Sequence, residues 1–151
     1  MRYDSRLSSI LHVLLHMAER PDRPVTSEAL AAHMNANPVQ VRRTMAGLRE
    51  AGFVRSEKGH GGGWTLACDL KAVSMRDIYA ALGSPALFAM GNRSENPNCL
   101  VEQAVNSALG ETLRDAEALV LERLGEISLA DLSADFHNRA VDAGHLWPKE
   151  K

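Results

Sequence analysis

The segment from residue 37 to residue 66 limits the fold of this chain more than any other. It begins with Asn-Pro, continues through apolar residues at helical spacing and the pair Arg42 and Arg43, and reaches a glycine at position 52. Two short strand-like runs follow, joined by Lys-Gly-His-Gly-Gly-Gly. A helix with paired arginines that leads directly into a basic, glycine-rich hairpin is typical of a winged helix-turn-helix. In that fold the helix can enter the major groove of DNA and the hairpin tip can reach the neighbouring backbone.

Asn37 and Pro38 mark the start of this helix. An Asn before the first turn can accept hydrogen bonds from the free amides, and a Pro at the first position loses no needed bond. Val41, Met45 and Leu48 then recur at the spacing of one helical face, and the arginines lie off that face. We therefore expect the apolar face to pack into the core and the other face to carry the charge.

The rest of the chain is predicted to be mainly helical. Helices are expected over residues 5–19, from 26 or 27 to 34, over 74–82, from about 97 to 127 and from 128 onward, with strands at 53–57 and 63–67. The expected fold is mainly α with a small β-hairpin wing, a winged helix-turn-helix domain plus a long C-terminal dimerisation helix. The expected division is a DNA-binding domain at 1–82, a linker or hinge at 83–98, and the dimerisation and C-terminal helices at 99–151.

The long helix carries apolar residues every three or four positions. An intrachain core could cover such a stripe, but its length exceeds what a small domain can bury, which favours burial against a second subunit. The residues expected at this interface are Val101, Val105, Leu109, Leu113, Ala116, Val120 and Leu124.

Charge is distributed unevenly along the chain, whose formal net charge is −2. Residues 1–68 contain nine Lys and Arg and six Asp and Glu, a net charge of +3. Residues 69–151 contain eight Lys and Arg and thirteen Asp and Glu, a net charge of −5. A basic first half and an acidic second half suit a nucleic-acid-binding domain joined to an assembly element.

Taken together, these motifs resemble the Rrf-two family of bacterial winged-helix transcription regulators, whose members include iron–sulfur, nitric-oxide and cysteine-metabolism sensing repressors. The resemblance implies a homodimer that presents two recognition helices and two wings to a near-palindromic operator. The matching segments are 5–8, 12–15, 26–31, 37–43, 48–54, 59–67, 96–99 and 128–132.

Nine residues are expected to contact DNA. A guanidinium can bind a guanine edge or clamp a phosphate, and glycines let backbone amides approach a phosphate closely. A solvated helix face and an ordinary glycine-rich hairpin are the alternatives. The nine residues are Asn37, Val39, Gln40, Arg42, Arg43, Lys58, Gly59, His60 and Gly61.

The chain has two cysteines, Cys68 and Cys99. Family members that carry an iron–sulfur cluster use three closely spaced cysteines where this chain has Cys99 alone, so we expect no cluster and no other cofactor. Cys68 is expected to be a small buried hydrophobe. Cys99 is expected in the first turn of the long helix, where the helix dipole lowers a thiol pKa. A redox thiol and a structural cysteine at the family position both stay open.

His12 and His16 are four residues apart, a spacing that can hold a metal ion. No third ligand and no His-Glu-x-x-His pattern accompany them, so no metal site is expected.

The expected function is a DNA-binding transcription regulator, interpreted as a homodimeric repressor that is modulated through Cys99 if that thiol is reactive. Double-stranded DNA and a second copy are the expected partners, without a membrane, and the small-molecule effector is unknown. The cysteine usage and the lack of a signal peptide favour the cytoplasm.

The alternative is a winged-helix protein–protein module that does not bind DNA. An enzyme built on Cys99 would need a paired base, an oxyanion motif or a cofactor loop, and none is evident, so no enzyme is expected.

Overall fold

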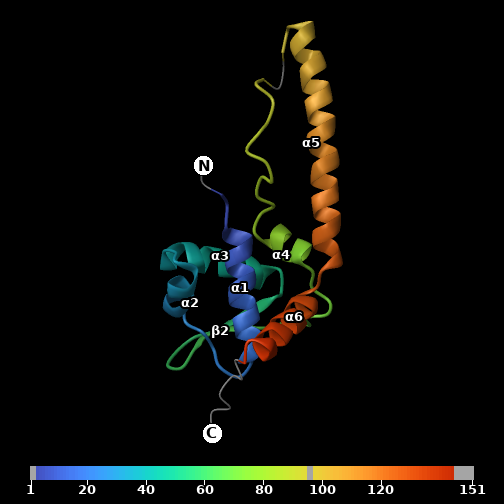
Figure 1. Ribbon diagram of the computed structural model, residues 1–151. Helices are drawn as coiled ribbons and strands as arrows, with labels where there is room; N and C mark the ends of the chain where they lie inside the picture. The colour runs from blue at the N-terminus through green and yellow to red at the C-terminus, as the bar shows by residue number, and fades with distance from the viewer. Residues whose placement is uncertain (1–2, 95–96, 145–151) are drawn as a thin grey trace.

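The computed structural model describes residues 3–94 and 97–144. One long helix projects from a body of shorter elements (Figure 1). The predicted mainly α fold with a two-stranded hairpin is confirmed, and the elements are α1 (Arg6–Glu19), α2 (Ser27–Met34), α3 (Pro38–Glu50), β1 (Val54–Glu57), β2 (Gly63–Leu66), α4 (Met75–Ala81), α5 (Leu100–Glu126) and α6 (Leu129–Asp142). Within the described ranges, no helix combines the length and apolarity that a bilayer span requires.

Local capping signals explain where several helices begin. The Asn37 side chain accepts a hydrogen bond from the Val39 amide at 2.8 Å, so α3 starts at the predicted Asn-Pro pair. Ser74 and Ser128 each form a reciprocal capping box with the Asp three residues later, which starts the helices predicted to begin there. The long helix α5 differs from the prediction by two or three residues, because it begins at Leu100 and Cys99 occupies its N-cap.

The core lies among α1, α2, α3, β1, α4 and the start of α6. On α3 the three residues predicted to face inward, Val41, Met45 and Leu48, are buried, which turns the opposite face of this helix outward. The largest fully buried side chains are Ile10, Leu14, Leu30, Met45, Leu48, Ile78, Leu129, Val13, Val41 and Val54.

The wing is an antiparallel hairpin of β1 and β2, in register from Val54 opposite Leu66 to Glu57 opposite Gly63. A short bridge adds Val25 to it, because the Val25 and Trp64 amides donate to each other's carbonyl oxygens at 2.9 and 2.8 Å. The buried Trp64 ring also donates from Nε1 to Oγ of Ser27 at 3.0 Å. The wing is therefore tied to the start of α2 through Trp64.

The segment before α5 runs back along that helix (Figure 1). The Tyr79 hydroxyl donates to the Pro85 carbonyl near the start of the segment. Farther along, the Asn106 side chain donates to the Ser94 carbonyl at 2.6 Å. The predicted linker thus lies against α5 where the structure describes it. Residues 95 and 96 of the linker, and residues 145–151 of the predicted third segment, lie outside the described residues.

The last helix returns to the body. A bridge joins Ser74 to Ser128, with the Leu129 amide donating to the Val73 carbonyl at 2.9 Å. Leu129 itself is fully buried in the core. The core therefore crosses the predicted division at residues 82 and 98, because Leu129 of α6 packs with residues of the first segment.

The close approach of the wing to Val25 generates a stability prediction. A Cβ added at Gly63 would lie 2.7 Å from the Val25 carbonyl oxygen. We expect Gly63→Ala to lower the free energy of unfolding by about 1–3 kcal/mol, the usual cost of overpacking, in urea denaturation followed by circular dichroism. Gly91→Ala is the control, because its added Cβ would meet open space. Equal stability of the two variants would contradict the close approach.

Candidate nucleic-acid interface

The outward face of α3 carries the first group of predicted contact residues. Asn37, Val39 and Gln40 are exposed at its N-terminal end, and Arg42 and Arg43 are exposed one turn later. The positive end of the helix dipole and these side chains therefore share one region of the surface. Such an end can receive a phosphate or meet base edges in the major groove.

Arg42 has a partner on the preceding helix. Its Nη2 donates to Oε1 of Glu28 on α2 at 2.9 Å, with the two side chains 56% and 67% exposed. Exposed ion pairs contribute about 1 kcal/mol or less. The pair can therefore hold the guanidinium between the two helices and still exchange its carboxylate for a phosphate.

Arg49 joins the other end of α3 to the wing. Its Nη1 donates to Oγ of Ser56 on β1 at 3.3 Å, and its guanidinium carbon lies 5.8 Å from the centre of the Trp64 ring. This link was not predicted, because Arg49 and its partners belong to separate elements and share no sequence motif. It is a direct contact between α3 and the wing.

The tip of the wing carries the second group of predicted contact residues, Lys58, Gly59, His60 and Gly61, all exposed. The turn is narrow: the Gly62 amide donates to the Gly59 carbonyl at 3.0 Å. Without side chains on its glycines, the tip can bring backbone amides close to a phosphate beside the charge of Lys58.

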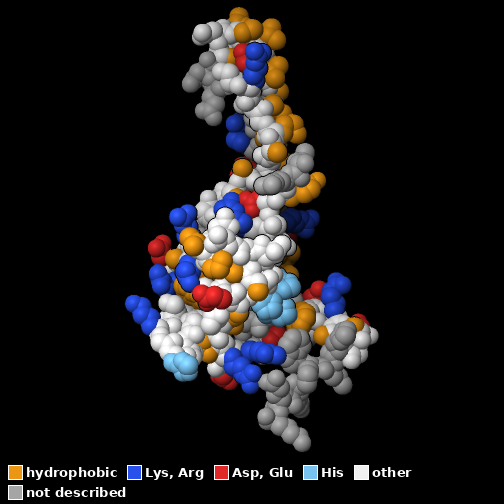
Figure 2. All heavy atoms as spheres, turned by 90° about the vertical axis from the view of Figure 1, so that its left-hand side faces the viewer, with side chains coloured by type: hydrophobic (Ala, Val, Ile, Leu, Met, Phe, Trp, Pro, Cys, Tyr) orange, Lys and Arg blue, Asp and Glu red, His pale blue; other side chains and the backbone are white. Residues whose placement is uncertain are grey.

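The two groups lie on the same side of the body. In Figure 1, α2, α3 and the wing are on the left, and α5 and α6 are on the right. Figure 2 faces the left-hand side and shows Lys and Arg side chains spread over it, with fewer Asp and Glu. The structure therefore brings the nine predicted residues to one side as two separate patches, the N-terminal part of α3 and the wing tip.

The cysteines occupy different environments. Cys68 is half-buried against the core, and burial raises the pKa of its thiol. Cys99 is exposed at the N-cap of α5, where the Glu102 amide first and the Val101 amide second lower the pKa of its thiol. The sulfur makes no side-chain capping hydrogen bond. The structure thus places Cys99 at the N-cap of α5 and not in the predicted first turn, and the nearby amides act on its pKa in the predicted direction.

The histidines of α1 form part of a larger cluster. The ring centroids of His12 and His16 are 4.6 Å apart, and His33 on α2, which the sequence pattern did not indicate, stacks 5.9 Å from His16. Partial burial, followed by the charges of His12 and His33, lowers the pKa of His16. Within the described ranges, no group of three or more His, Cys, Asp and Glu is arranged to hold a metal ion.

The predicted dimerisation residues divide into two sets. Val101 and Val105 are 73% and 54% exposed, and Val120 is also exposed. The other four are half-buried against this chain itself, and Leu113 lines a small cavity with the apolar residues of the linker. The half-buried set is Leu109, Leu113, Ala116 and Leu124.

Comparison with known proteins points to the same class of protein as the geometry does, a transcriptional regulator. The family model Rrf2, described as an iron-dependent transcriptional regulator, matches residues 3–135. The chain is 32% identical over 130 residues to YwnA of Bacillus subtilis, a protein assigned as an HTH-type transcriptional regulator. That match covers 85% of this chain and 95% of YwnA.

Solved structures share the fold. A protein from Lactobacillus plantarum assigned as a transcriptional regulator superposes with a TM-score of 0.74 at 22% identity, covering 97% of this chain and 99% of that one. CymR, the global cysteine regulator of Bacillus subtilis, superposes with a TM-score of 0.60 at 22% identity, covering 89% and 97%. At these identities the likeness establishes the fold.

The environments of the two cysteines predict opposite titration behaviour. In a Cys68→Ser protein only Cys99 remains, and we expect the pH profile of iodoacetamide alkylation to have its midpoint below the value of about 8.5 for a free cysteine. A lowered pKa leaves more thiolate at neutral pH, so alkylation there should be faster. The control is Cys99→Ser, in which half-buried Cys68 should titrate above that value. Coincident profiles for the two variants would contradict the assignment.

Proposed function

Because this chain belongs to the Rrf2 family of transcriptional regulators, which bind DNA and are not enzymes, we propose that it binds a near-palindromic operator as a homodimer and represses transcription there. The observation that carries the proposal is the shared placement of two basic patches. The exposed arginines of α3 and the wing tip lie on one side of a body whose other side leads into α5.

The contacts differ in what they supply. The α3 end with Arg42 and Arg43 is proposed to enter the major groove, where a guanidinium can bind guanine in two places. Arg42 exchanges its Glu28 partner for a phosphate as the helix docks. Lys58 and the wing amides bind the neighbouring backbone, which positions the helix without reading sequence. The bonds from Arg49 and Val25 to the wing set the spacing between the two patches.

The exposed apolar face of α5 supports the dimer. In Figure 2 hydrophobic side chains follow one edge of the projecting helix. Leu100, Val101, Val105, Leu119 and Val120 all expose a large part of their surface. An apolar face of this length in water is costly, and a second copy of the same helix would bury it. A two-fold axis through that contact would present two reading surfaces to a symmetric operator.

The available ligands do not fit an iron–sulfur cluster held by three cysteines. The chain has two cysteines, and Cys68 packs against the core at the wing, whereas Cys99 is exposed at the start of α5. We therefore propose that the protein works without a cluster, and protein purified anaerobically should contain no stoichiometric iron and sulfide.

Cys99 is the proposed point of redox input. Its exposure and lowered pKa favour thiolate chemistry such as oxidation to a sulfenate. A structural cysteine is the alternative, and unchanged DNA affinity after peroxide, together with identical behaviour of Cys99→Ser, would establish it.

The DNA contacts predict the behaviour of a double variant. We expect Arg42→Ala with Lys58→Ala to lower affinity for DNA from upstream of the gene at least about tenfold, because charged hydrogen bonds contribute about 1.5–3 kcal/mol each. If both residues bind phosphate, the slope of log affinity against log salt should fall by about 1.8. Fluorescence anisotropy across a salt series measures both quantities. A reporter driven by that upstream DNA should become more active with this variant if the protein represses.

Arg139→Ala is the matched control, because Arg139 lies on α6 and pairs with Asp135. It should bind as the unmodified protein does. A double variant that binds normally would exclude the proposed contacts. An unmodified protein that binds none of this DNA would favour the protein–protein module instead.

The dimer predicts a second result. We expect Val105→Glu to shift the protein from dimer to monomer in analytical ultracentrifugation and to weaken DNA binding, because the new carboxylate would be buried in an apolar interface. Val105 is a sharper test than Leu113, whose side chain is half-covered by its own chain. Val141→Glu makes the same change at an exposed position on α6 and should leave the dimer intact. A Val105→Glu protein that remains dimeric would count against the α5 interface.

A further inference from the structure

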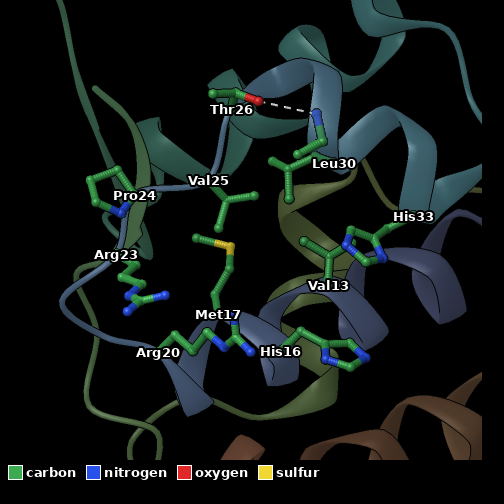
Figure 3. A pocket seen from close by; sticks show the side chains of 11 residues that line it. Val13, His16, Met17, Arg20, Arg23, Pro24, Val25, Thr26, Leu30 and His33 are labelled. Atoms are coloured by element: carbon green, nitrogen blue, oxygen red, sulfur yellow. Dashed lines mark hydrogen bonds between the residues drawn. The ribbon is translucent and has the colours of Figure 1, made fainter. Parts of the chain in front are cut away.

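A cavity of about 460 Å³ lies between α1, the loop after it and α2, and none of its described lining residues belongs to the patches assigned to DNA or to α5. Figure 3 shows its walls. Val13, Met17 and Leu30 belong to the core and give it an apolar floor, and Val25 closes the side next to the wing. Cavities of this volume with apolar walls hold small organic molecules in many proteins.

Basic side chains surround this apolar floor. Figure 3 shows Arg20 and Arg23 toward one end and His16 and His33 toward the other. Of the described residues that line the cavity, none is Asp or Glu. Partial burial first, and then the neighbouring His12 and His33, lower the pKa of His16, whereas the nearby Glu19 acts in the opposite direction. An apolar floor with guanidinium and imidazole groups at its rim is complementary to an organic anion.

We infer that this cavity binds a small organic anion, with an apolar body and one carboxylate, sulfonate or phosphate group, and that binding lowers the affinity of the protein for DNA. The second half of this inference rests on the proposed function. The first half concerns ligand binding alone and stands independently of it.

The walls of the cavity explain how a ligand would act on the DNA-binding surface. Val25 lines the cavity with its side chain and pairs through its backbone with Trp64 of the wing. Thr26 also lines it and caps α2 by accepting a hydrogen bond from the Ala29 amide at 3.1 Å. A ligand that separates α1 from α2 would shift both anchors and change the spacing between wing and α3. The ligand then shifts the population toward the state that binds DNA less well. The size of this shift is set by the difference between the affinities of the ligand for the two states.

The binding test uses two fluorescent probes and the full chain. The anionic probe is 8-anilinonaphthalene-1-sulfonate, and N-phenyl-1-naphthylamine has nearly the same apolar body without the sulfonate. We expect saturable binding of the anion at one site per chain, about tenfold or more tighter than binding of the neutral probe, as one charge-assisted hydrogen bond would give. Equal affinity for the two probes would overturn the assignment to an anion.

Matched variants locate the site. Ala29 is exposed at the cavity wall, whereas Ala32 is exposed on the same helix and does not line the cavity. Ala29→Phe should lower the affinity for the anion at least tenfold, and Ala32→Phe should leave it unchanged. Arg23→Gln should weaken binding of the anion and not of the neutral probe, with Arg139→Gln as its control. Anion binding that survives both Ala29→Phe and Arg23→Gln would place the probe elsewhere, for example on the apolar face of α5, and overturn the proposal.

The regulatory half is tested by anisotropy with labelled upstream DNA. A saturating concentration of the anionic probe should lower DNA affinity several-fold in the unmodified protein and in Ala32→Phe, with no change in Ala29→Phe. A probe that fills the cavity and leaves DNA affinity unchanged would overturn this half. If the unmodified protein binds no DNA, the proposed function fails, and the probe titration still decides whether the cavity is an anion site.

Discussion

The burial of one face of α3 is the constraint on which the rest of this structure depends. Val41, Met45 and Leu48 are fully enclosed by the core, so α3 cannot rotate without exposing them to water. The arginines on the opposite face must therefore point outward. The wing joins this unit by two further contacts: Arg49 of α3 donates to the first wing strand, and Trp64 pairs through its backbone with Val25 before α2. The packing of α3 and these contacts to the wing together place the two basic patches.

Strong interactions hold the recognition unit together, and weak interactions hold the charged side chains on its outer face. The recognition unit is held by apolar burial and paired backbone groups, which are hard to exchange. The outward charges are held by exposed pairs such as that of Arg42 with Glu28, which contribute little to stability and compete weakly with phosphate. The proposed anion cavity lies between α1 and α2 of the same scaffold, where Val25 lines the cavity and pairs through its backbone with Trp64 of the wing. Regulation and DNA binding would therefore share one set of anchors.

Sequence reasoning predicted the features that depend on neighbouring residues. The cap at Asn37, the helix starts near residues 74 and 128 and the inward face of α3 depend on local signals, and the structure confirms them. Contacts between separate elements carried no such signal, and this applies to the partner of Arg42, the link from Arg49 to the wing, and the meeting of His16 with His33. Helical spacing likewise predicted the apolar stripe on α5 and could not show that the linker half-covers Leu113. The DNA contacts and the dimer remain predictions.

Hydroxyl-radical footprinting of the purified protein on the DNA upstream of its gene tests the central claim most directly. Two rigid reading units related by a two-fold axis should protect two equivalent stretches, with centres separated by about 10 base pairs or a multiple of that spacing. Each stretch should combine protection of the sugars that flank the α3 contact with protection of the backbone under the wing beside it. Protection of a single asymmetric stretch, or of two stretches without that symmetry, would contradict the account.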